Sequence, residues 1–137
     1  MTVTALINID VDDLDRAVAF YTAAFGLRVG RRFGAGAVEL EGATSPMYLL
    51  TKAAGTAAGS ATGERRRYAR HWTPVHLDFV VASLESALAA ALAAGATLED
   101  EPATHAWGRI AHLADPFGHG LCLIEFLGRG YDEIATR

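Results

Sequence analysis

The stretch LINIDVDDL, residues 6–14, decides the fold because a similar pattern, HLDFVVASL, returns seventy positions later at residues 76–84. Each stretch opens on an apolar, strand-like run and holds, near its end, a polar residue suited to cap a helix. Apolar residues then recur at helical spacing until a glycine, Gly26 or Gly95, ends the pattern. The sequence therefore predicts two copies of a unit that starts with a strand and a capped helix.

Three further strand-like runs follow each predicted helix, separated by turns that contain glycine or proline. They cover residues 27–33, 37–40 and 47–51 in the first copy and residues 96–98, 109–113 and 121–126 in the second. Asp12 or Asp13 is expected to cap the first helix, and Ser83 the second. The predicted fold class is α+β, with two βαβββ modules in tandem inside a single domain of residues 1–137.

The first module is expected over residues 4–52 and the second over residues 73–127, with a linker at 53–72. The small residues at 53–63 predict a flexible connection. Four arginines follow between Arg65 and Arg70. They either bind an anionic ligand or form the solvated, charged end of the linker. The second interpretation is favoured, because most charged runs lie at the surface.

The bulk composition narrows the classes of partner. A net charge of −4 argues against binding of a nucleic-acid backbone, which needs a basic surface. No run approaches the roughly 20 apolar residues that span a bilayer, so no membrane partner is expected. The single cysteine, Cys122, excludes an intramolecular disulfide. Together with an N-terminus that lacks the pattern of a signal peptide, it favours a cytoplasmic location.

Two motifs resemble those of a known superfamily. DLDRAVAFYTAAFGL at residues 13–27 resembles the DLxRSxxFYxxxLG opening of the vicinal oxygen chelate superfamily, which contains glyoxalases, bleomycin-resistance proteins and dioxygenases. DPFGHG at residues 115–120 resembles the start of its closing motif, DPxGxxxE. The resemblance spans residues 4 to about 127. It implies two half-barrels that enclose a cavity, and chains that often form homodimers.

Metal-dependent members of this superfamily place four ligands in that cavity, usually histidine and glutamate. The resemblance assigns these positions to Leu6, Leu49, His76 and Cys122. His76 is the only plausible retained ligand, although Cys122 could bind a soft metal as a thiolate. The two leucines offer no donor atom. The resemblance therefore implies that the usual metal centre is lost: no cofactor is expected, although a divalent metal is not excluded.

Strand alternation adds polar residues to the expected cavity. Asn8 and Asp10 share a face with Leu6, and Asp78 shares one with His76. A histidine beside a carboxylate can transfer protons near neutral pH, so His76 and Asp78 are the candidate catalytic residues. The alternative is that both side chains only satisfy hydrogen bonds within the fold.

A second cluster, HAWGR at residues 105–109, offers an aromatic surface in Trp107 and a planar donor group in Arg109. His112 lies on the opposite parity of the same predicted strand. The cluster either contacts a ligand or forms a surface loop that one tryptophan packs.

Two functions stay open. The favoured one is a metal-free binding protein for a small, partly aromatic molecule, because leucine at position 6 does not suit an enzyme of the ordinary metal type. Its expected ligand contacts are Asn8, Asp10, Leu49, Trp107, Arg109 and Cys122. The alternative is an enzyme, such as a glyoxalase-like lyase, an isomerase or a dioxygenase. It would use His76 with an unusual metal set or metal-free acid–base catalysis.

Overall fold

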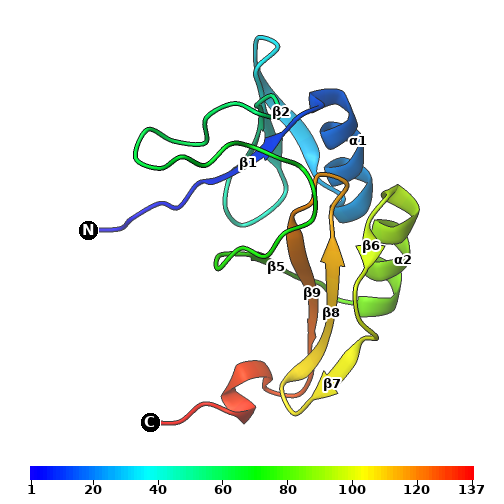
Figure 1. Cartoon of the computed structure of the whole chain (residues 1–137). Coiled ribbons are helices and arrows are strands. Elements are labelled where there is room, and N and C mark those ends of the chain that lie inside the picture. Colours follow the sequence, from blue (N-terminus) through cyan, green and yellow to red (C-terminus); the bar gives the residue numbers. More distant parts are fainter. The chain divides into compact units, whose positions relative to one another are not determined.

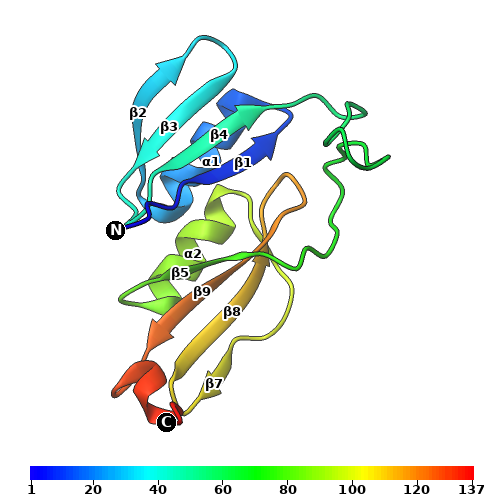
Figure 2. The ribbon, with the colours of Figure 1, turned by 90° about the vertical axis from the view of Figure 1, so that its left-hand side faces the viewer.

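The structure is a computed structural model that describes all 137 residues, and they form two compact units, residues 1–69 and 70–137. Each unit consists of a mixed β-sheet with one α-helix packed on one of its faces (Figure 1). Figure 2 looks onto the opposite face of each sheet, with each helix behind its own sheet. Neither helix has the length and apolar character needed to cross a bilayer.

The first unit contains β1 (Ile7–Val11), α1 (Leu14–Phe25), β2 (Arg28–Phe33), β3 (Ala37–Glu41) and β4 (Met47–Thr51). Its four strands lie in the order β1-β4-β3-β2. β1 runs parallel to β4, and the other neighbours are antiparallel. This is one βαβββ module.

The helix α1 begins and ends where the sequence predicts. Asp13 is the N-cap, and its carboxylate accepts a hydrogen bond of 3.0 Å from the backbone N–H of Arg16. Gly26 ends the helix at φ 67°, in the left-handed region that glycine adopts without strain. Ala17, Phe20, Tyr21 and Ala24 form its buried face. The helix therefore packs on the sheet through one apolar stripe.

The second unit repeats this plan with one addition. Its elements are β5 (Leu77–Val80), α2 (Leu84–Ala94), β6 (Thr97–Leu98), β7 (Ala103–His105), β8 (Gly108–Ala114), β9 (Gly120–Phe126) and the 3-10 helix η1 (Gly130–Glu133). The strand order is β5-β9-β8-β6, and β7 also pairs with β8. Ser83 caps α2, and Gly95 ends it, as expected. The α+β fold with two βαβββ modules in tandem is confirmed.

The extra strand is β7, which was not predicted. β6 and β7 both pair antiparallel with β8. Together they take the place that β2 has in the first unit. The run between them contains Pro102, which has no N–H to donate to a ladder. The second strand of this module, the first after its helix, is therefore divided in two.

The segment between the predicted modules is also more structured than expected. Residues 53–66 fold back on themselves, because Gly55 N–H donates to the carbonyl of Arg66 and Ala58 N–H donates to that of Glu64. Ala57 and Arg65 form an antiparallel bridge. The expectation of a plain flexible linker is therefore wrong for this stretch, since backbone hydrogen bonds close it into a loop.

Candidate ligand pocket

One face of the second sheet is free of α2 and carries a row of functional side chains. Asp78 on β5 is the parallel partner of Cys122 on β9. His112 on β8 is the antiparallel partner of the same cysteine. Because directly paired residues point to the same side of a sheet, these three side chains lie next to each other. His76, two residues before Asp78 and directly before β5, extends the row.

His76, Asp78 and Cys122 are in mutual reach. The Nδ1 atom of His76 lies 3.2 Å from Oδ1 of Asp78. One ligand-type atom from each of the three residues lies within 4.8 Å of the other two. Burial, together with the nearby Asp78 carboxylate, raises the pKa of the Cys122 thiol to about 12. The thiol is therefore protonated at neutral pH and is a poor nucleophile on its own.

A pocket of about 240 Å³ opens beside this row. One wall is the segment that leads into β5, and the floor is formed by β8 and β9. Trp72 is the aromatic side chain of the wall, and 78% of its surface is exposed. The lining residues are Arg70, Trp72, Thr73, His76, Glu99, His112, Leu113, Gly120, Leu121 and Cys122. Apolar surface with a few fixed polar groups is typical of small-molecule sites.

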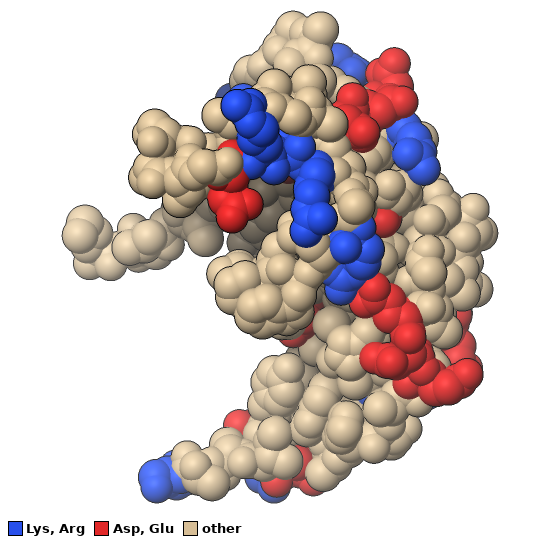
Figure 3. Space-filling model, viewed as in Figure 1, with Lys and Arg blue, Asp and Glu red and all other residues tan.

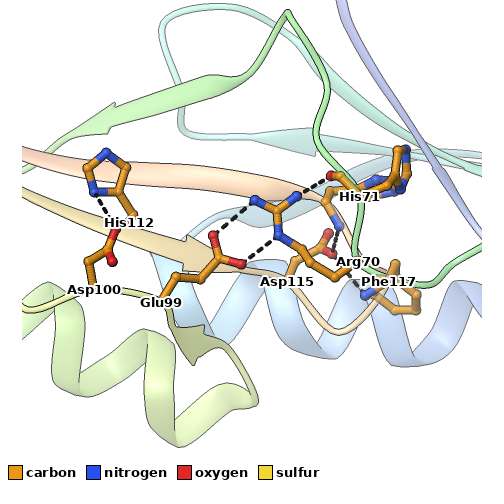
Figure 4. Close-up of polar contacts among 8 residues, drawn as sticks. Arg70, His71, Glu99, Asp100, His112, Asp115 and Phe117 are labelled. Atoms are coloured by element: carbon orange, nitrogen blue, oxygen red, sulfur yellow. Dashed lines mark hydrogen bonds and ion pairs between the residues drawn. The ribbon is translucent and has the colours of Figure 1, made fainter.

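An ion pair between Arg70 and Glu99 forms the edge of the pocket (Figure 4). Nε of Arg70 lies 2.6 Å from Oε2 of Glu99, and Nη2 lies 2.9 Å from Oε1. Nη1 of Arg70 donates to the carbonyl of His71. The hydrogen bonds between the Arg70 and Glu99 side chains are the main cause that lowers the pKa of Glu99 and raises that of Arg70. Such a two-point contact fixes the guanidinium plane.

Gly120 makes room for that guanidinium. A Cβ atom at this position would lie 2.5 Å from Nη2 of Arg70 and 2.9 Å from its Cζ. Any side chain here would therefore push Arg70 away from β9. On the other side of the pair, Nδ1 of His112 lies 3.7 Å from Oδ2 of Asp100 (Figure 4).

The DPFGHG motif sets the start of β9. The buried carboxylate of Asp115 accepts hydrogen bonds of 2.8 Å from the N–H of Phe117 and 2.9 Å from that of His119. Phe117 is fully buried. Gly118 adopts φ 85°, which favours glycine. This turn therefore fixes the point at which Gly120 and Cys122 enter the pocket floor.

In the first unit, Asn8 and Asp10 lie on the sheet face opposite α1. Asp10 pairs with Arg66, whose Nε lies 2.9 Å from Oδ2 of Asp10, and only 19% of the Arg66 side chain is exposed. The favoured expectation, that the arginine run is only the solvated end of a linker, is therefore wrong. Arg66 and Arg70 each bind a carboxylate of their own unit.

The predicted match of Leu49 to Cys122 is off by one residue. Leu49 pairs with Ile9, and both are buried on the face that α1 covers. Asn8, which corresponds to Asp78, pairs with Tyr48. A shift of one residue turns every side chain of a strand to the other face. Tyr48 therefore takes the position in the first unit that Cys122 takes in the second.

Tyr48 belongs to a polar cluster that the sequence did not reveal. Its hydroxyl lies 3.1 Å from Oε2 of Glu39, which is only 8% exposed. Arg31 binds the same carboxylate through Nε at 3.0 Å and Nη2 at 2.6 Å. Hydrogen bonds from Arg31 are the main cause that lowers the pKa of Glu39 to about 2. The phenol of Tyr48 therefore hydrogen-bonds to a carboxylate that is charged at neutral pH.

The remaining predicted contacts, Trp107 and Arg109, lie away from the pocket. Trp107 occupies the turn between β7 and β8, stacked on His105 at 5.2 Å between ring centroids. Its other neighbours are Phe126 and Tyr131. Nη1 of Arg109 lies 3.2 Å from the Glu85 carboxylate of α2, on the helix-covered side of the sheet.

Comparison of the sequence with known protein families agrees with the observed fold. A family model described as a glyoxalase-like domain matches residues 6–124. The chain belongs to the glyoxalase-like domain family. It is thus a member of the wider glyoxalase/bleomycin-resistance/dioxygenase superfamily that the two motifs resemble.

Two sequence relatives of this glyoxalase-like chain are similarly named. It is 31% identical over 131 residues to the anthracycline biosynthesis protein DnrV of Streptomyces peucetius, covering 94% of this chain and 43% of the relative. It is 31% identical over 124 residues to the anthracycline biosynthesis protein DauV of Streptomyces sp. (strain C5), covering 87% and 40%. The glyoxalase-like chain spans less than half the length of these relatives.

Solved structures share the fold at lower identity. TioX from Micromonospora sp. ML1 matches with a TM-score of 0.69 at 18% identity, over 92% of this chain and 100% of that one. A glyoxalase/bleomycin resistance protein/dioxygenase family enzyme from Burkholderia phytofirmans PsJN matches with a TM-score of 0.67 at 20% identity, over 89% and 97%. These similarities show the glyoxalase-like fold.

The four ligand positions implied for metal-dependent superfamily members do not fit a metal in this glyoxalase-like chain. Once the register is corrected, they are Leu6, Tyr48, His76 and Cys122. Leu6 has no donor atom, and the Tyr48 phenol is bound to Glu39. Only the two positions in the second unit carry ordinary donors. The residues that reasoning from sequence missed at the pocket are Arg70, Trp72 and Glu99, which come together only through the fold.

Proposed function

We propose that this chain binds a small, partly aromatic molecule in the pocket of the second unit and does so without the superfamily's four-ligand metal centre. The observation that carries the proposal is the exposed indole of Trp72 in the wall of a pocket that also holds fixed polar groups. An exposed aromatic face of this kind is suited to stack on a planar ligand. The ring oxygens or amines of such a ligand would meet His76, His112 and the Arg70–Glu99 pair.

The names of the two curated relatives support an aromatic ligand. Both are called anthracycline biosynthesis proteins, and anthracyclines are polycyclic aromatic compounds. The donor set supports a function without the usual metal, since one implied ligand position is leucine and another is an engaged tyrosine. Binding without chemistry also agrees with a Cys122 thiol that is held protonated.

One test is calorimetric titration of metal-depleted protein, kept in EDTA, with the soluble planar probe 1-(2-aminoethylamino)anthraquinone. We expect saturable binding of one probe per chain. Trp72→Ala should weaken it about fivefold or more, because a stacked ring contact contributes on the order of 1 kcal/mol or more. Trp107→Phe is the matched control in the same unit and should change the affinity less than twofold. No saturable binding, or equal loss in both variants, contradicts the proposal.

A second candidate is metal-free acid–base catalysis, which is favoured by one observation, the 3.2 Å contact between His76 and Asp78. A carboxylate at this distance can orient an imidazole and stabilise its charged form. In that case Asp78→Asn would leave probe affinity within about threefold, because Asp78 does not line the pocket. Asp78→Asn and His76→Ala would both abolish conversion of any lyase or isomerase substrate found by screening. Retained turnover in His76→Ala would exclude this role.

A further inference from the structure

We infer that the pocket of the second unit presents hydrogen-bond acceptors and therefore selects a planar ligand that carries a free phenolic hydroxyl. The inference rests on the proposed function and deepens it, because it names the chemical class of the ligand for the same pocket. It follows from where the N–H and O–H groups of the lining side chains already donate. Several of them bind partners within the protein, which leaves their acceptor atoms for a ligand.

The imidazole of His76 is the first such group. Its Nδ1 atom lies 3.2 Å from Oδ1 of Asp78. An ionised carboxylate only accepts hydrogen bonds, so the ring proton of neutral His76 is on Nδ1, and Nε2 is an acceptor. His76 lines the pocket and Asp78 does not. Asp78 is therefore a positioning residue, which acts on the ligand through the tautomer of His76.

The side chains of Thr73 and Arg70 are engaged in a similar way. Oγ1 of Thr73 donates to the carbonyl of Val75 over 2.9 Å, and a hydroxyl has only one proton to give. Thr73 therefore meets a ligand with its lone pairs. Arg70 donates from Nε and Nη2 to Glu99 and from Nη1 to the carbonyl of His71 (Figure 4). Three of the five N–H groups of its guanidinium are thus engaged within the protein.

Acceptor atoms therefore prevail at the pocket surface. They are Nε2 of His76, Oγ1 of Thr73 and the carboxylate of Glu99, which has more lone pairs than Arg70 uses. A ligand that only accepts hydrogen bonds would cut these atoms off from water and leave them unpaired, which costs free energy. A phenolic hydroxyl donates to one of them, and its hydrogen lies in the plane of the ring that stacks on Trp72.

His112 provides the contrast to His76. It also lines the pocket, but its Nδ1 atom lies 3.7 Å from Oδ2 of Asp100, which is too far for a hydrogen bond. This carboxylate therefore does not fix the tautomer of His112. Replacing Asp100 removes a carboxylate beside a pocket histidine without moving a ring proton. It is the matched control for replacing Asp78.

The first test compares the binding of 2-naphthol and 2-methoxynaphthalene to the full chain by equilibrium dialysis at pH 7.5, where the naphthol is un-ionised. The rings are identical, and only the hydroxyl can donate. Burial of apolar surface alone would favour the methyl ether, which has one more methyl group. We expect the opposite order, with 2-naphthol bound about fivefold more tightly or more. Asp78→Ala should lower this preference by about threefold or more, and Asp100→Ala should change it less than twofold.

The second test locates the ring proton in the ligand-free protein. Two-bond ¹H–¹⁵N correlation spectra at pH 8 distinguish Nδ1–H from Nε2–H in a neutral imidazole. We expect His76 to carry its proton on Nδ1 in the wild type and to shift towards the Nε2–H form in Asp78→Ala. The signals of His112 should stay unchanged in that variant. A change confined to one histidine separates a tautomer shift from a general loss of structure, and circular dichroism confirms that each variant is folded.

Two results would overturn the inference. One is a methyl ether that binds as tightly as 2-naphthol, in which case the proposed function stands and only the ligand class is wrong. The other is a wild-type His76 that carries its proton on Nε2. If neither the naphthalenes nor the anthraquinone probe bind, the proposed function itself fails, and the inference fails with it.

Discussion

Glu39 is a carboxylate on the sheet face that α1 leaves free, and it is still only 8% exposed. Arg31 and Tyr48 enclose it, and Phe33 lies beside both, 6.3 Å from the tyrosine ring and 5.5 Å from the guanidinium carbon. A carboxylate that accepts several hydrogen bonds in its charged form is stabilised in that form. The acidity of this one residue is therefore linked to the stability of the first sheet.

Replacing Glu39 by glutamine should destabilise the protein in a pH-dependent way. The folded-state pKa of about 2 is below the ordinary value of 4.5. The stabilisation is thus fully present above pH 4.5 and is lost as the pH falls towards 2. Urea midpoints of wild type and Glu39→Gln should differ clearly at pH 7 and converge towards pH 3. The exposed neighbour Glu41, changed to glutamine, should show no such convergence. A difference that does not depend on pH would refute the linkage.

At the level of elements, the helix caps were the most predictable feature, because a cap is a local signal. The sequence left Asp12 and Asp13 as alternatives, and the structure selects Asp13. Asp13→Ala and Ser83→Ala should each lower the free energy of unfolding by about 1 kcal/mol, since each leaves helix N–H groups without a partner. Asp12→Ala is the control and should cost less than half as much. Chemical denaturation measures all three. Equal costs at positions 12 and 13 would be incompatible with the observed cap.

The hairpin formed by β8 and β9 tolerates no side chain at Gly108. This residue has φ 156°, and a Cβ atom there would lie 2.3 Å from the carbonyl oxygen of Glu125. The clash is with backbone of the central strand, so it cannot be relieved by a rotamer change. We expect Gly108→Ala to cost about 2 kcal/mol or more, measured as a lower denaturation midpoint. Gly34→Ala is the comparison, because its φ of 61° is also positive but its Cβ would meet no atom within 4 Å. It should therefore cost less than Gly108→Ala.

Periodicity and turn signals predicted both helices and most strands because these depend on neighbours in sequence. The strand β7 was missed because it has only three residues, directly after a break that contains Pro102. Three residues are too few to show the alternation of a strand. The register of β4 was misplaced by one residue, because alternating apolar residues alone do not say which neighbour pairs with Asn8. The contact of Arg70 with Glu99 joins residues 29 positions apart, which no local pattern encodes.

On the scale of the whole molecule, charge is divided unevenly along the chain. The second unit, with the pocket, carries nine acidic residues against four arginines. Acidic side chains gather where β6 gives way to β7, at residues 99–101 (Figure 3). The negative potential of these acidic residues raises the local concentration of cations, and salt screens it.

The uneven charge predicts which aromatic probes bind better. At low ionic strength, the cationic aminoethylamino-anthraquinone should bind more tightly than anthraquinone-2-sulfonate, which has the same ring system and the opposite charge. The dissociation constant of the sulfonate divided by that of the amine should fall towards one in 0.5 M salt, where the Debye length is only about 4 Å. Calorimetry under both conditions gives the ratio. A sulfonate that binds as well as the amine at low salt would show that Arg70, and not the acidic surroundings, dominates recognition.

The break between β6 and β7 has a consequence for how this protein can evolve. Residues 99–102 are not part of a strand, although the N–H of Glu99 donates to the carbonyl of His112. The same residues supply Glu99 to the pocket. Lengthening such a connection costs little, because the entropy of closing a loop grows slowly with its length. Insertions here would reshape the pocket wall while both flanking strands keep their pairing with β8. The divided strand thus offers a place where ligand preference can change without loss of the fold.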